Sequence, residues 1–110
     1  MKIIYNSLIP FPGFKAINIF GIMFVRNECR NRISDYTINH ETIHTEQMKE
    51  LGYIPFYIIY LIEWFIRLFC KGNAYRNISF EQEAYDNEKN LNYIKTRKRY
   101  NWIKYWKNKK

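Results

Sequence analysis

The feature that most constrains this chain is the segment from His40 to His44. It reads His-Glu-Thr-Ile-His and contains both histidines of the 110 residues. On an α-helix, side chains four positions apart lie on one face about one turn apart, so both imidazoles can point at one metal ion. Glu41 follows the first histidine and can act on a water bound to that ion. The pattern therefore predicts a helix that carries two zinc ligands and a general base.

The same pattern also fits a polar surface helix that carries two histidines by chance, because it fixes only three residue types. The flanking residues favour a helix over 34–52. Ser34 or Asp35 can cap its start, and Gly52 followed by Pro55 is typical of its end.

The rest of the chain predicts a single α+β domain, with strands first and helices after them. Residues 1–33 hold short apolar runs separated by loops, with a bend expected at Gly21. An apolar helix is expected over 55–70 and a more polar helix over 74–95. A basic, aromatic tail, 96–110, follows.

The net charge of +8 invites a nucleic-acid or anionic-membrane partner. The abundance of Lys, Asn, Ile and Tyr together would equally follow from an AT-rich genome, so we do not favour nucleic acid. We expect the tail to be a solvated, partly packed helix, and contact with anionic lipid or RNA is the alternative.

Membrane contact is expected to be peripheral at most. The apolar stretch 54–69 has about 16 residues, fewer than the roughly 20 that span a bilayer, and it contains Glu63 and Arg67. We expect it to be buried, with docking on a membrane or a second protomer as the alternative. Cys29 and Cys70 are far apart in sequence, which favours a reduced, cytoplasmic chain.

A zinc site with an open position takes three protein ligands, and the chain has no third histidine. The third ligand is therefore expected to be a carboxylate or a cysteine, and acidic residues cluster over 81–86. A helix of about 16 residues is about 24 Å long. It can run back antiparallel to the motif helix, so that the following helix lies beside His40 and His44.

The segment from Asn77 to Ala84 reads Asn-x-x-x-Glu-x-x-Ala. It resembles the glutamate helix of gluzincin metallopeptidases. Together with the histidine motif, it makes the chain similar to the minigluzincins, which keep only the upper half of a gluzincin catalytic domain. The chain also resembles the HtpX-like peptidases, although Tyr85 stands where they have Asp. The resemblance covers about 16–93.

The resemblance implies a reduced zincin-like fold, with a small N-terminal antiparallel sheet or hairpin over the motif helix. One strand would form a rim to which an extended peptide could add. It also implies zinc ligands at His40, His44 and Glu81, with Glu41 as the general base. Glu83 is the alternative ligand, but it points about 200° around the helix from Glu81, so the two cannot both serve.

Further roles follow from the same resemblance. Asn77 and Tyr85 are expected to contact and orient the ligands without binding the metal themselves. A peptidase also needs a donor for the oxyanion, for which Tyr75, Arg76, Tyr85 and Tyr93 are the candidates.

The expected reaction is peptide-bond hydrolysis by a zinc-activated water, with a peptide or protein as substrate. The missing lower half leaves open a latent or inactive zinc-binding pseudoenzyme, blocked by its own tail or by a partner and acting as a binding module. A basic membrane-surface or RNA-binding domain is the other alternative. The presence of Glu41 argues against a purely structural site, which needs ligands but no base.

Overall fold

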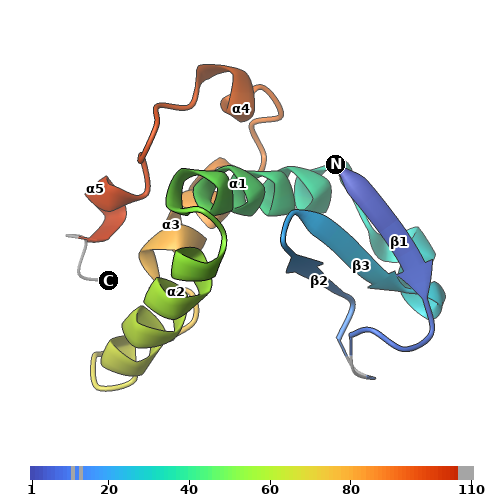
Figure 1. Ribbon diagram of the computed structural model, residues 1–110, viewed down its shortest axis with the longest axis horizontal. Coiled ribbons are helices and arrows are strands. Elements are labelled where there is room, and N and C mark those ends of the chain that lie inside the picture. The colour runs from blue at the N-terminus through green and yellow to red at the C-terminus, as the bar shows by residue number, and fades with distance from the viewer. Residues whose placement is uncertain (11, 13, 107–110) are drawn as a thin grey trace.

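A small sheet precedes a helical body in the computed structural model, which describes residues 1–10, 12 and 14–106 (Figure 1). The α+β class is confirmed. The elements in chain order are β1 (Lys2–Asn6), β2 (Ala16–Ile19), β3 (Ile22–Arg26), the 3-10 helix η1 (Asn27–Arg32), α1 (Asp35–Leu51), α2 (Ile54–Arg67), α3 (Ser79–Asn87), α4 (Tyr93–Thr96) and α5 (Ile103–Trp106).

The sheet has the strand order β1-β3-β2, so β2 is an edge strand. β2 and β3 form the predicted antiparallel hairpin, and β1 pairs parallel with β3, so the sheet is mixed rather than antiparallel. The expected bend at Gly21 is a two-residue turn in which Phe20 and Gly21 both have positive φ, 50° and 87°. Such a turn matches the twist of a hairpin.

The motif helix α1 forms where the sequence predicts it. The Ser34 side chain accepts a hydrogen bond from the Thr37 N–H at the first turn, and Gly52 ends the helix in the left-handed conformation. The Tyr53 N–H then returns to the Met48 carbonyl, at 2.8 Å. Local signals therefore determine both ends of this helix.

The apolar helix α2 differs from the expectation in two ways. It leaves α1 at a steep angle instead of lying antiparallel along it (Figure 1). It also buries its charged residues, Glu63 and Arg67, while many of its large apolar side chains are exposed. Among the described residues, no helix is long and apolar enough to cross a membrane.

The glutamate helix α3 is shorter than the predicted 74–95. Its first residue, Ser79, donates from its backbone N–H and its hydroxyl to the Glu63 carboxylate, at 2.6 and 2.8 Å. This carboxylate from α2 satisfies the start of α3, so the helix begins at Ser79 and not earlier. After α3 the chain turns into the short helix α4.

The main core lies where α1, α2, α3 and the tail meet. Its buried members are Met48, Phe56, Ile78, Phe80 and Trp102. The tail is therefore packed through Trp102, as its aromatic content allows, and residues 107–110 lie outside the described part. Of the two free cysteines, Cys29 is buried under the sheet and Cys70 is exposed.

Candidate metal centre

The side chains of His40, His44 and Glu81 meet in one buried cluster between α1 and α3. The Glu81 Oε1 atom lies 3.0 Å from the Nε2 atom of each histidine, and the two Nε2 atoms lie 3.2 Å apart. Ligands on a tetrahedral zinc at bond lengths of about 2.0–2.1 Å are about 3.3 Å from one another. The three donor atoms therefore have nearly the spacing that a zinc ion requires.

The other nitrogen of each imidazole is held by a separate partner. His40 Nδ1 lies 2.8 Å from Glu88 Oε1, and His44 Nδ1 lies 2.8 Å from Gln47 Oε1. Both partners are acceptors, so each Nδ1 carries a proton and donates it. A neutral imidazole then has its lone pair on Nε2, which faces the shared centre. This arrangement is typical of histidines that bind a metal.

The amide of Gln47 is oriented by its own contacts. Its Nε2 donates to the Phe80 carbonyl at 3.1 Å and to Glu83 Oε1 at 2.9 Å. Both of these atoms accept, so the amide oxygen must face His44. Gln47 thus connects His44 to a second buried carboxylate, that of Glu83.

The electrostatics of the cluster favour a positive charge at its centre. Burial raises the pKa of Glu81, but the charge of His44 and hydrogen bonds from both histidines outweigh it and hold that pKa far below its usual range. Burial lowers the pKa of His44, but the neighbouring Glu81 raises it overall, to about 9. Tyr60 donates to the second oxygen of Glu81, at 2.7 Å. Glu81 is therefore an ionised, fully oriented carboxylate.

Glu83, the alternative ligand, has a different role. It points away from the histidines and accepts from Gln47, from the Tyr93 hydroxyl at 2.5 Å and from Arg97 at 2.6 and 3.0 Å. Burial raises its pKa, but these hydrogen bonds, led by Arg97, lower it overall. The geometry thus places Glu81, and not Glu83, beside the two imidazoles.

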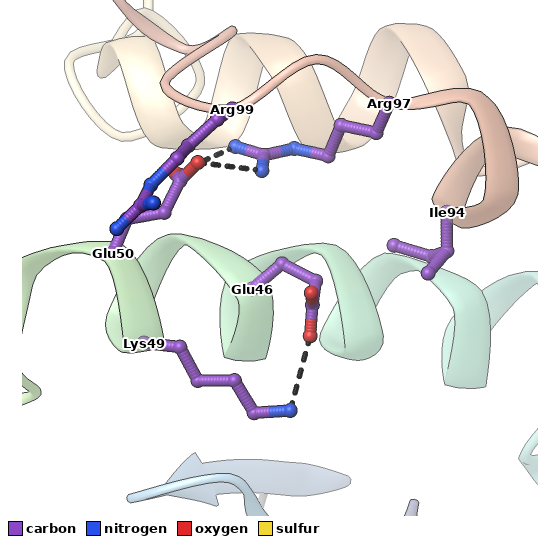
Figure 2. A pocket seen from close by; sticks show the side chains of 6 residues that line it. All are labelled: Glu46, Lys49, Glu50, Ile94, Arg97 and Arg99. Atoms are coloured by element: carbon purple, nitrogen blue, oxygen red, sulfur yellow. Dashed lines mark hydrogen bonds and ion pairs between the residues drawn. The ribbon is translucent and has the colours of Figure 1, made fainter.

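Arg97 joins Glu83 to a third carboxylate, that of Glu50 on α1. Its two terminal nitrogens donate to the two oxygens of Glu50, at 3.1 and 3.0 Å. Figure 2 shows this pair above α1, with Glu46 and Lys49 paired on the same helix at 3.2 Å. A continuous series of hydrogen bonds therefore runs from His44 through Gln47, Glu83 and Arg97 to Glu50.

A cleft of about 280 Å³ opens beside the cluster, and Glu41, His44 and Glu81 line it. Glu41 is half-buried there, and within the described part of the chain no hydrogen bond or ion pair engages its carboxylate. The base predicted from the motif therefore faces the same space as two of the predicted ligands.

The edge strand β2 forms one wall of the cleft, through Ala16, Ile17 and Asn18. The Asn18 side chain donates to the Glu41 carbonyl at 3.0 Å and to Thr45 Oγ1 at 3.1 Å. These two bonds fix the edge of the sheet directly over the motif helix.

The predicted oxyanion donors fall in different places. Tyr75 lines the cleft, and its hydroxyl accepts from that of Tyr85 at 3.5 Å. Arg76 stacks over the Tyr85 ring, 4.1 Å from its centre. Tyr93 is bound to Glu83 instead. Of these candidates, Tyr75 alone is placed to reach a substrate in the cleft.

The predicted supporting residues are also divided. Tyr85 packs edge-to-face on His40, with ring centres 4.6 Å apart. Tyr85 therefore holds the His40 imidazole by packing. The HtpX-like pattern has an Asp at this position instead. Asn77 is buried, and its amide donates to the Lys71 carbonyl at 3.3 Å, behind the start of α3.

Four residues of the site were missed from the sequence: Gln47, Tyr60, Glu88 and Asn18. Gln47 is three positions after His44 and Glu88 seven after Glu81, so helical spacing alone would place each on the ligand face. Tyr60 and Asn18 come from other elements, and no spacing in the sequence connects them to the motif.

The chain was compared with protein-family models, with curated proteins and with solved structures, and nothing matches in any of the three comparisons. The resemblance to gluzincins therefore rests on the two sequence motifs alone.

Proposed function

We propose that this chain is a zinc-dependent metallopeptidase of the gluzincin type, with His40, His44 and Glu81 as the ligands. The observation that supports this most strongly is the convergence of three buried donor atoms at zinc-like spacing, with the Glu41 carboxylate facing the adjoining cleft. When bound there, zinc supplies Lewis-acid activation of water and of a substrate carbonyl.

Glu41 is the general base in this proposal. Its carboxylate takes a proton from the attacking water and then delivers it to the amine that leaves when the peptide bond breaks. The Tyr75 hydroxyl is the proposed donor to the oxygen of the scissile carbonyl as negative charge develops on it. Tyr60 and Glu88 orient the ligands and take no part in proton transfer.

The outer edge of β2 at Ala16 is the proposed binding surface for the substrate backbone, because the Asn18 carbonyl already accepts from the Tyr57 hydroxyl at 3.3 Å. The Arg26 N–H donates to the Lys15 carbonyl at 3.2 Å, so Lys15 and Arg26 form a hydrogen-bonded pair of the hairpin. Pairs alternate along antiparallel strands, so the backbone groups of Ala16 and Asn18 point away from β3. An extended peptide can pair with Ala16 and pass directly over Glu41.

The latent alternative receives no support from the tail. None of the residues that line the cleft lies after Glu81 in the described part of the chain. The described part of the tail, which ends at Trp106, therefore does not block the cleft, and a partner that covers the cleft is the form of this alternative that we keep. A cytoplasmic location remains part of the proposal, because both cysteines are free thiols.

The test is the Glu41→Gln variant, measured for zinc content and for cleavage of a peptide library. Glu46→Gln on the same helix is the matched control. Glu41→Gln should keep its zinc and melting temperature and lose activity by a factor of at least about 100. Zinc-loaded wild type that cleaves no peptide, or Glu41→Gln as active as wild type, would overturn the proposal.

A further inference from the structure

The outward face of α2 carries an apolar stripe that the rest of the described chain does not cover. Its members recur at helical spacing and continue just past the end of the helix: Ile58, Leu61, Ile62, Phe65, Leu68 and Phe69. Leu61, Phe65 and Phe69 are 63%, 59% and 80% exposed. A contiguous apolar surface of this kind usually marks a site of interaction.

The inward face of α2 packs Phe56 into the core near its start and carries both charges of the helix further along. Glu63 is 0% exposed and Arg67 is 9% exposed. Glu63 is held by Ser79, and Arg67 lies 3.7 Å from Glu63 and donates to the Trp106 carbonyl at 3.3 Å. The two charges therefore do not oppose contact of α2 with a lipid surface, because both are turned away from the stripe.

Cations and aromatic side chains accompany the stripe. Lys71 is exposed two residues after Phe69, and Trp64 is 40% exposed on the helix itself. The bond from Arg67 brings the end of α5 to the end of α2, and there Trp106 is 46% exposed and Lys104 is also exposed. Apolar residues with half-exposed Trp and nearby Lys are typical of helices that lie at the lipid–water interface.

We propose that α2 docks this chain on an anionic membrane surface, with the helix lying in the plane of the interface. A helix of 14 residues is about 21 Å long, which is too short to span the bilayer but suits this orientation. A second copy of the chain could also cover the stripe. However, each copy carries a net charge of +8, which opposes self-association and favours anionic lipid. The inference does not depend on the zinc site.

The test uses flotation of the whole chain with vesicles of phosphatidylcholine alone or with 30% phosphatidylglycerol. The variant is Leu61→Glu/Phe65→Glu, and the control is Leu8→Glu/Leu91→Glu, which adds the same charge at exposed positions on other segments. Wild type and control should float with the anionic vesicles. The α2 variant should bind more weakly by about tenfold or more for each side chain, because its apolar contacts are lost.

Thermal unfolding of both variants checks that the fold is unchanged, as expected for exposed positions. Three outcomes overturn the inference: wild type that does not float, wild type that floats equally with neutral vesicles, and an α2 variant that floats as well as the control. A wild-type dimer that the α2 variant dissociates, without vesicle binding, would assign the stripe to a second copy instead.

Discussion

Replacing Arg97 with methionine would test whether the tail is an integral part of the metal centre. The Arg97 guanidinium contacts two carboxylates, Glu83 and Glu50. Its side chain is 5% exposed, against 0% for Glu83 and 7% for Glu50. Methionine has a similar length and removes the charge, so both carboxylates lose their cation while the packing volume changes little.

The expected loss of stability is large. Removing one partner of a buried ion pair costs about 3–5 kcal/mol, because the other charge is left uncompensated. Gln47 and Tyr93 still donate to Glu83, so the lower end of this range is expected. In a domain of this size, a loss of 3 kcal/mol lowers the melting temperature by about 12 °C or more.

The assay is chemical denaturation of zinc-loaded protein at pH 7, followed by circular dichroism. Arg99→Met is the matched control, because Arg99 is exposed, and it should change stability by less than about 0.5 kcal/mol. Arg97→Met/Glu83→Gln should recover part of the loss, because the second change removes a buried charge. An Arg97→Met protein within about 1 kcal/mol of wild type would refute this reasoning. A chain cut before Arg97 should be destabilised in the same way, and not simply activated.

Two further predictions concern carboxylates that contact the ligands or α3. Glu88→Ala should weaken zinc binding by about 10–100-fold, because His40 loses the acceptor that orients it, and Glu88→Gln should weaken it less. Competition with a chelator measures the zinc affinity of both variants. A Glu88→Ala affinity within about twofold of wild type would contradict the prediction. Burial raises the pKa of Glu63 above its ordinary 4.5, although Ser79 and Arg67 lower it in part. The folded chain therefore holds the Glu63 proton more tightly than the unfolded chain does. The stability that this proton contributes is fully present below the pKa of Glu63 in the unfolded chain, and it is lost as the pH rises through the higher pKa of the folded chain. Between pH 4 and 7 the stability of wild type should thus fall relative to Glu63→Gln, as measured by denaturation across this range; a difference that stays constant or grows would contradict it.

The parts of the fold set by local chemistry were predictable. The ends of α1 follow from Ser34 and Gly52, and the hairpin turn follows from Gly21, because capping and positive φ act within a few residues. The spacing of His40 and His44 also determines that they share a face.

Features set by contacts between distant segments were not predictable. The start of α3 depends on Glu63, which lies 16 positions earlier, and the parallel pairing of β1 depends on a crossover that no local pattern encodes. The choice of Glu81 over Glu83 required the resemblance. The structure supplies the physical reason, because Arg97 from the tail neutralises Glu83 and leaves Glu81 to face the imidazoles.

The most direct test of the central claim is a crystal structure of zinc-loaded protein, with anomalous data collected on both sides of the zinc absorption edge. The account predicts one strong anomalous peak per chain, with His40 Nε2, His44 Nε2 and a Glu81 oxygen at about 2.0–2.2 Å. A peak bound by Glu83 or by a cysteine, or zinc-saturated crystals without a peak between α1 and α3, would contradict it.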